Sequence, residues 1–273
     1  MGLALVVLAL ARPASERHEA WRTPAQGVEI MLVIDCSGSM QARDYTLEGR
    51  SASRLEAVQA VVRDFIEKRT EDALGLVLFG ETAALQCPLT DDHAILRTLV
   101  DALAIDKQVS GSRTAIGTAL MLAADRLRGR EAKSRVIVLL TDGENNAGMD
   151  PIDAARVAKE TGARLFIIGA GGRTFWNGII EDSKGNRGYM PTPPLNEEAI
   201  RRIADAAGGT FLRAADTKAL ADSYAQIDAM VKTEKPVTRF HSLTDYYAWA
   251  VIPALGAIVL AVVLAQTALR RLP

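Results

Sequence analysis

The chain has 273 residues, 49% of them hydrophobic and 24% charged, which is enough to form one large domain core with attachments. Its 32 Lys and Arg nearly balance its 33 Asp and Glu, and the net charge of −1 argues against a nucleic-acid partner. Two cysteines, Cys36 and Cys87, make no disulfide framework, although a single bridge between them is an alternative, and three scattered histidines argue against a histidine-based zinc site.

Residues 1–11 are apolar, but they are too few to cross a bilayer, and they lack the charged leading region and the cleavage site of a signal peptide. The stretch looks like the second half of a membrane helix, with Arg12 and Pro13 marking its exit from the membrane. We therefore predict a partial transmembrane segment over residues 1–12, which would make the N-terminus a truncated one, and a linker over 13–26.

Apolar runs alternate with amphipathic stretches through the central part of the chain. The runs predict buried strands at 28–35, 73–79, 83–87, 135–141, 164–169 and 210–214. Apolar residues at helical spacing predict helices at 54–68, 92–103, 115–127, 153–161, 197–207 and 218–231. This alternation predicts an α/β domain over 27–233, with a doubly wound, mainly parallel sheet flanked by helices.

Two hairpins interrupt the predicted alternation. The turn residues Gly80-Glu81-Thr82 separate two short apolar runs and predict one hairpin there. A second excursion over 173–194 carries Trp176 and Tyr189 around a Lys-Gly-Asn turn. It leaves the carboxyl end of a strand, so we interpret it either as a recognition surface or as an ordinary packed loop.

Asp35, Ser37 and Ser39 follow the first strand of the predicted domain at alternate positions, and Gly38 allows the tight turn that aims their oxygens at one point. Hard oxygen ligands of this kind favour Mg²⁺, with Mn²⁺ or Ca²⁺ as alternatives. The intervening Cys36 should point the other way, into the core, as a small hydrophobic residue.

Two later positions complete the predicted ligand set. Thr114 stands where the N-cap of the helix over 115–127 is expected, and Asp142 directly follows the strand over 135–141. Ligands in open α/β sheets bind outside the carboxyl ends of the strands, which is where both acids lie. The sequence therefore predicts one metal site formed by Asp35, Ser37, Ser39, Thr114 and Asp142.

A second apolar region lies near the C-terminus. Residues 246–269 contain no charged side chain and would form a helix about 36 Å long, against a hydrocarbon core of about 30 Å. We predict a transmembrane helix there, preceded by a linker over 234–245. Arg270 and Arg271 favour a cytoplasmic C-terminus, although Lys232, Lys235 and Arg239 on the other flank weaken the argument.

Enzymatic alternatives find little support in the motifs. The chain has no Gly-x-x-x-x-Gly-Lys-Ser/Thr, and Ser37 lacks the Gly-x-Ser-x-Gly elbow of a hydrolase nucleophile. An aspartyl nucleophile at Asp35 would want a second acid where Ser37 stands. We predict a binding site with no catalytic residues, and metal-assisted hydrolysis stays open as the alternative.

The pattern Asp35-x-Ser37-x-Ser39, followed by Thr114 and Asp142, resembles the metal-ion-dependent adhesion site (MIDAS) of von Willebrand factor A (VWA) domains. The helix start Arg54-Leu55-Glu56, the segment Pro88-Leu89-Thr90 and the terminal anchor resemble the bacterial aerotolerance BatA family in particular. The resemblance covers most of the chain. Proteins of that family usually begin with an additional transmembrane helix.

The resemblance carries further expectations. It implies that Asp142 acts on the ion through water, and that the ion docks an Asp or Glu of a partner protein. It implies an anchored domain that faces the periplasm from the bacterial inner membrane. The expected partners are other Bat-type VWA proteins and a MoxR-type AAA+ ATPase linked to stress tolerance. The alternative is an adhesin-like surface domain that binds an extracellular protein.

Overall fold

The computed structural model describes residues 14–17, 27–105, 113–130, 134–143, 145–172, 175–181, 187–232, 242–245 and 247–267. The chain divides into two compact units. One is formed by residues 24–235, and the other by residues 1–23 together with 236–273.

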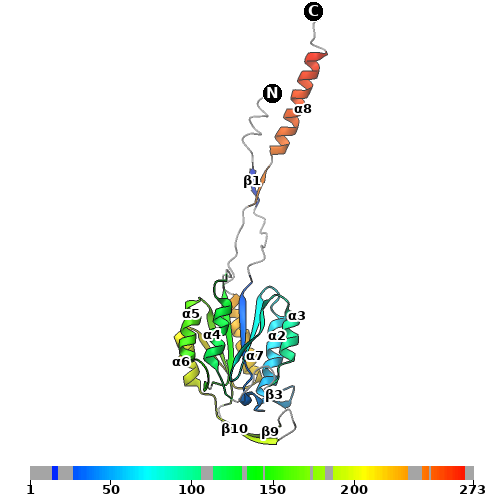
Figure 1. The fold of residues 1–273 in the computed structure, drawn as a ribbon. Coiled ribbons are helices and arrows are strands. Elements are labelled where there is room, and N and C mark those ends of the chain that lie inside the picture. The colour runs from blue at the N-terminus through cyan, green and yellow to red at the C-terminus, as the bar shows by residue number, and fades with distance from the viewer. Residues whose placement is uncertain are drawn as a thin grey trace, which may run out of the picture. The chain divides into compact units, whose positions relative to one another are not determined.

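A six-stranded sheet forms the centre of the 24–235 unit (Figure 1). Its strand order is β11-β8-β7-β2-β5-β6, and every pair is parallel except β5 with β6. The α/β class with a mainly parallel sheet is therefore confirmed. The strands are β2 (Glu29–Asp35), β5 (Ala73–Phe79), β6 (Ala83–Thr90), β7 (Arg135–Thr141), β8 (Arg164–Ala170) and β11 (Thr210–Ala214).

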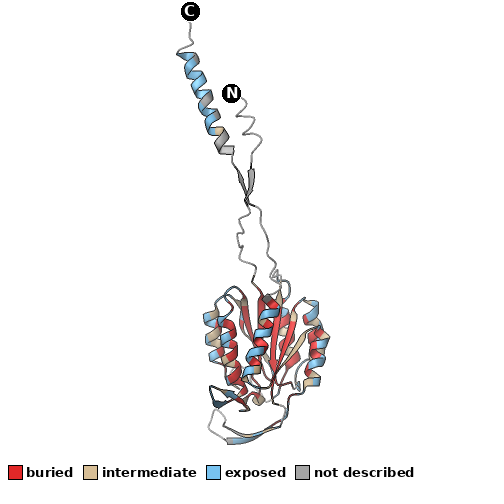
Figure 2. Ribbon diagram, turned by 180° about the vertical axis from the view of Figure 1, so that it is seen from behind, coloured by how far each residue is buried: buried red, intermediate tan, exposed pale blue. Residues whose placement is uncertain are grey.

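Helices cover both faces of this sheet, because alternate residues of each buried strand point to opposite sides. On β2, Ile30 and Leu32 pack into one apolar cluster and Met31 and Val33 into another. Figure 2 shows the strands buried and the outer sides of the helices exposed. The first cluster contains α2 (Arg54–Glu67), α3 (His93–Asp101) and α7 (Thr217–Lys232), and the second α4 (Ile116–Leu127), α5 (Pro151–Glu160) and α6 (Glu197–Ala207).

The start of α2 is fixed by its own sequence. Ser53 accepts a hydrogen bond from the Glu56 amide at 3.1 Å, and the Glu56 carboxylate accepts one from the Ser53 amide at 2.6 Å. This capping box satisfies donors that the first helical turn leaves open. It sets Arg54 as the first residue of the helix, at the carboxyl end of the sheet.

The segment between β2 and α2 contains structure that the sequence did not predict. After the short 3-10 helix η1 (Gly38–Gln41), strands β3 (Tyr45–Leu47) and β4 (Arg50–Ala52) form an antiparallel hairpin. Its turn residues Glu48 and Gly49 both have positive φ, 51° and 78°. A glutamate is rare in that conformation. Of the two turn residues, only Gly49 is of a type that predicts a hairpin turn from sequence.

The excursion over 173–194 is the hairpin that the sequence predicts. β9 (Trp176–Glu181) pairs antiparallel with β10 (Arg187–Thr192), and the predicted Lys-Gly-Asn turn lies outside the described residues. Figure 1 shows the hairpin at the same end of the sheet as β3. Phe175 and Tyr189 are exposed, by 54% and 67%.

The other unit contains a two-stranded antiparallel ladder between β1 (Ala14–Arg17) and β12 (Ser242–Asp245), and the helix α8 (Tyr247–Gln266), which contains Pro253. Across the part of the chain that the structure describes, no helix is both long and apolar enough to cross a membrane. A helix thus forms within 246–269 as predicted, but its transmembrane character is not confirmed. The predicted segment over 1–12 lies outside the described residues.

Candidate metal centre

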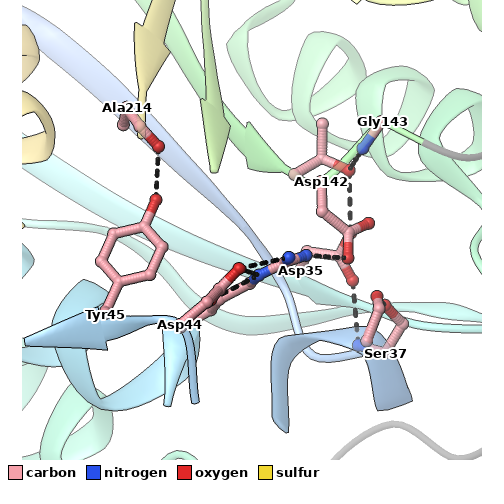
Figure 3. Close-up of polar contacts among 10 residues, drawn as sticks. Asp35, Ser37, Asp44, Tyr45, Asp142, Gly143 and Ala214 are labelled. Carbon is pink, nitrogen blue, oxygen red and sulfur yellow. Dashed lines mark hydrogen bonds and ion pairs between the residues drawn. The ribbon is translucent and has the colours of Figure 1, made fainter. Parts of the chain in front are cut away.

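Asp35 is the last residue of β2, and its side chain is fully buried. One carboxylate oxygen, Oδ1, accepts the Ser37 amide at 2.9 Å, and Oδ2 accepts the Thr141 hydroxyl at 2.8 Å (Figure 3). The Cys36 amide donates to the Phe79 carbonyl at 2.7 Å and continues the β2–β5 ladder past Asp35. The carboxylate is therefore held from both sides before any ligand is present.

The two serines follow on the turn that leads into η1. Ser37 is buried and Ser39 is half-buried, and their hydroxyl oxygens are 3.0 Å apart. Ser39 also lies close enough to the Asp142 carboxylate to lower its pKa. This places the two hydroxyls side by side between the acids that end β2 and follow β7.

Asp142 lies one residue beyond β7, the strand that pairs with β2 on the side opposite β5. Its side chain is almost completely buried, and its Oδ2 accepts a hydrogen bond from Arg54 Nη1 at 3.1 Å. The same guanidinium binds Asp44, with Nη2 at 2.6 Å from Oδ2. In Figure 3, Asp44 and Asp142 lie on opposite sides of the guanidinium that joins them.

Thr114 is positioned by its backbone. Its amide donates to the Asn146 side chain at 2.7 Å, and its carbonyl accepts the Asn146 amide at 3.0 Å. The next residue, Ala115, donates to the Gly80 carbonyl at 2.8 Å, beside the end of β5. Thr114 is buried at the carboxyl edge of the sheet, but it is not the N-cap of α4, because that position is taken by Ala115.

The structure thus brings four of the five predicted residues into one network and places Thr114 on the loop next to it. Among the described residues, no group of three or more His, Cys, Asp and Glu side chains is arranged to hold a metal ion. A metal at this position would have two carboxylates available, Asp35 and Asp142, so hydroxyl oxygens would have to supply other ligands.

The electrostatics of the site oppose the simultaneous ionisation of its two carboxyl groups. Burial, and after it the negative charge of Asp142, raise the pKa of Asp35 to about 7, against the opposing effect of its hydrogen bonds from Ser37 and Thr141. Burial also raises the pKa of Asp142, while Ser39 and Arg54 act to lower it. The site therefore has an excess of buried negative charge that a cation would neutralise.

Three polar residues of the site were not found by sequence reasoning: Thr141, Arg54 and Asp44. Thr141 is the last residue of an apolar strand, and nothing in the sequence around it indicates a role in the site. Arg54 precedes the apolar positions of α2 and reads as an exposed charge, yet its side chain is 1% exposed. Its contact with Asp142 joins residues 88 positions apart, which no local pattern encodes.

Cys36 lies in the core as predicted, with 0% exposure, and burial raises the pKa of its thiol to about 12. Both cysteines are free thiols, so the alternative of a bridge is wrong. His93 is the one histidine that the structure describes, and its ring hydrogen-bonds the Asp72 carbonyl at 2.9 Å. Asp72 directly precedes β5, so this contact lies at the amino ends of the parallel strands, whereas Ser37 lies at their carboxyl ends.

Comparison with known proteins supports the same fold. The family model of the von Willebrand factor type A domain matches residues 29–226. An uncharacterized protein of Borreliella burgdorferi is 32% identical over 61% of this chain, which spans about half (47%) of that protein. A UPF0353 protein of Nocardia farcinica is 30% identical over 86% of this chain and 71% of its own length.

Solved structures agree. The crystal structure of an aerotolerance-related membrane protein from Bacteroides fragilis is 28% identical and has a TM-score of 0.64, covering 76% of this chain and 100% of that one. Proximal thread matrix protein 1 from the mussel byssus, solved with zinc in its MIDAS motif, is 21% identical with a TM-score of 0.55, over 89% of this chain and 52% of that one. The second likeness shows the fold alone.

Proposed function

This chain belongs to the von Willebrand factor type A domain family, and we propose that it binds a divalent cation in order to dock acidic groups of partner proteins. The observation that carries the proposal is the buried pair Asp35 and Asp142, with the adjacent hydroxyls of Ser37 and Ser39 beside them. Two acids and two hydroxyls at one strand edge form an oxygen-only donor set, which suits Mg²⁺ or Mn²⁺.

The residues present fit such an ion. Asp35 would supply charge to the ion, because it is a fully buried carboxylate whose ionisation is opposed by burial and by the charge of Asp142. Ser37, Ser39 and Thr114 would supply neutral oxygens, and Asp142 would act from its place beside Ser39. A bound divalent ion favours ionised carboxylates and neutralises the repulsion between the two acids.

The protein would provide few charged ligands for a divalent ion. Mg²⁺ commonly keeps several waters when it is bound by one or two carboxylates. An Asp or Glu of a partner could replace one of those waters and complete the neutralisation. We therefore propose a docking role, in which affinity depends on the ion and specificity on the surface around it.

The β9–β10 hairpin is the surface we propose for specificity. Gly171, at the start of the segment that leads to it, adjoins Arg54: a Cβ built on Gly171 would lie 3.7 Å from the Arg54 Cζ atom. Phe175 and Tyr189 present exposed aromatic rings on this excursion. Aromatic side chains of this kind commonly supply much of the binding energy of an interface.

We propose that the site binds and does not catalyse. The Ser37 hydroxyl contacts the hydroxyl of Ser39, and no described histidine lies near it to act as a base, since His93 sits at the other edge of the sheet. A nucleophilic serine needs such a base within hydrogen-bond reach. Metal-dependent hydrolysis would be supported only by turnover that appears when the ion is added.

We further propose a place at the bacterial inner membrane, with the domain in the periplasm. Support comes from the Bacteroides fragilis relative, which is described as an aerotolerance-related membrane protein, and from the apolar side chains that α8 exposes. These are Ile252, Leu255, Ile258, Val259, Leu260, Val262, Val263 and Leu264. Residues 246–269 would be the anchor, and other Bat-type VWA proteins and a MoxR-type AAA+ ATPase would be the partners.

The metal is tested by thermal unfolding of the full chain with Mg²⁺, with Mn²⁺ and with EDTA. An ion at one hundred times its Kd should stabilise the domain by about 2.7 kcal/mol. Asp35→Ala should abolish this stabilisation, whereas the exposed acid Asp153→Ala should keep it. Equal stabilisation of the Asp35→Ala protein would show that the ion binds elsewhere.

The docking role needs a separate measurement. Crosslinking and pull-down from native membranes, with and without Mg²⁺, should capture partners that are lost in EDTA and lost with Asp35→Ala. A partner that binds equally well in EDTA would refute metal-dependent docking.

A further inference from the structure

We propose that Arg54 is a positioning residue of the metal centre, which holds the Asp142 carboxylate in place and couples it to the β3–β4 hairpin. The inference rests on the proposed function, because it concerns how the same site is built. It assigns a role to the Arg54 guanidinium, which is not itself an expected metal ligand but donates a hydrogen bond to Asp142.

The geometry is that of a fork between two acids. Nε of Arg54 lies 3.0 and 3.1 Å from the two carboxylate oxygens of Asp44, and Nη2 lies 2.6 Å from Oδ2. The remaining nitrogen, Nη1, donates to Asp142 Oδ2 at 3.1 Å. One planar guanidinium therefore uses separate edges for two carboxylates, which a lysine ammonium cannot reproduce.

Burial makes this arrangement rigid. The Arg54 side chain is 1% exposed, and those of Asp44 and Asp142 are 13% and 6% exposed. A buried charge is tolerated only where partners satisfy it, so none of the three side chains can turn away without leaving an unpaired charge. Because one oxygen of Asp142 is committed to Arg54, the carboxylate keeps one orientation toward Ser39 and Asp35.

The same guanidinium connects the metal centre to the β3–β4 hairpin. Asp44 immediately precedes β3, and Tyr45 donates its hydroxyl to the Ala214 carbonyl at the end of β11 (Figure 3). Two adjacent residues at the start of the β3–β4 hairpin are thus held, Asp44 by Arg54 and Tyr45 by the end of β11. The orientation of Asp142 depends on this hairpin through a single side chain.

Arg69 provides a matched control. It lies two residues past the other end of α2, its side chain is also 1% exposed, and it also bridges two aspartates. The distances are 2.7 Å to Asp72 and 2.9 Å to Asp228. Asp72 accepts the amide of Val28, before the first residue of β2, so this second fork lies at the edge of the sheet opposite Asp35.

The test compares Arg54→Lys with Arg69→Lys in the full chain. Mn²⁺ affinity is measured by calorimetric titration and by the electron paramagnetic resonance signal of free Mn²⁺, and thermal stability is measured in EDTA. Both lysine variants keep the positive charge and lose the fork, so both should lower the unfolding temperature. Only Arg54→Lys should weaken Mn²⁺ binding, by about 10–100-fold, the usual effect of removing a group that orients a metal ligand.

The possible outcomes distinguish a failure of the role of Arg54 from a failure of the proposed metal site. Unchanged Mn²⁺ affinity in Arg54→Lys would overturn the role of Arg54 and leave the metal site standing. Equal losses in Arg54→Lys and Arg69→Lys would also overturn it, because they would show a general effect of stability. A native chain that binds no Mn²⁺ would refute the proposed function itself. If Arg54→Lys does not fold, Asp44→Asn replaces it, since it releases Nε and Nη2, and unchanged affinity there would overturn the inference as well.

Discussion

Asp35, at the end of β2, and Asp142, just after the end of the neighbouring strand β7, share one buried site in which the charge of Asp142 opposes the ionisation of Asp35. The hydroxyls of Ser37 and Ser39 lie between the two acids. Of these acids, Asp142 is the one that Arg54 contacts. The site is therefore strained electrostatically when both acids are charged, and a divalent ion or a proton would relieve it.

The first prediction concerns stability without metal. The pKa of Asp35 rises from 3.8 to about 7 on folding, mainly because of burial. A carboxyl whose pKa is higher in the folded state stabilises the fold below its unfolded pKa, and that contribution is lost as the pH rises through about 7. In EDTA, the native protein should lose a few kcal/mol relative to Asp35→Asn between about pH 4 and 8. Unfolding temperatures measured across this range check it, and parallel curves for the two proteins would contradict it.

The second prediction concerns metal affinity and pH. A cation needs the ionised form of Asp35, so each binding event below about pH 7 releases the proton that the buried carboxyl holds. Mn²⁺ affinity should therefore rise by up to about tenfold per pH unit below pH 7 and level off above it. Calorimetry in two buffers of different ionisation enthalpy measures the released proton. Binding without proton release at pH 6 would show that Asp35 is already ionised.

The third prediction tests the loop that carries Thr114. A Cβ on Gly117 would lie 2.2 Å from the Met149 carbonyl oxygen, so Gly117→Ala must displace the loop after β7, whose Asn146 binds Thr114. We expect a loss of about 1–3 kcal/mol in stability and weaker Mn²⁺ binding. Gly188→Ala is the control, because nothing lies within 4 Å of its Cβ. Native affinity in Gly117→Ala would show that this loop contributes no ligand.

The fourth prediction concerns the β9–β10 hairpin. Tyr189 is 67% exposed, so Tyr189→Ala should leave the unfolding temperature unchanged while it weakens a docked partner by about 1–3 kcal/mol. Trp176→Ala should weaken some partners selectively, but it should also reduce stability, because the Trp176 ring packs over Gly178. Binding to a partner recovered by Mg²⁺-dependent crosslinking gives the measurement. Full affinity in both variants would remove the hairpin from the interface.

The fifth prediction concerns membrane orientation. Both native cysteines are buried, with 0% and 5% exposure, and should not react with a polar maleimide in the folded protein. Lys68→Cys places a thiol at a side chain that is 67% exposed. If the domain faces the periplasm, this variant should be labelled in cells with an intact inner membrane. Labelling only after lysis would reverse the orientation.

The sequence by itself determined the α/β class, most of the strands and helices, and the positions of Asp35 and Asp142 at the carboxyl ends of two strands. These features follow from local patterns, because apolar periodicity marks buried strands and helix faces, and parallel strands bring their carboxyl ends to one edge. The excursion over 176–192 was also visible, as two short runs around a turn. The β3–β4 hairpin was not, since Glu48 occupies a turn position that glycine or asparagine usually marks.

Only the tertiary structure decided how the site is held. Thr141 donates to Asp35 across 106 positions of sequence, and Arg54 reaches Asp142 across 88. Both contacts depend on the register of β2 with β7, in which Ile34 faces Leu140, and on the helix start that the Ser53 cap sets. The sequence alone does not indicate whether an arginine is solvated or buried between two acids. Its burial is decided by the packing of α2 against the sheet, because that packing brings the guanidinium within reach of carboxylates from two other elements.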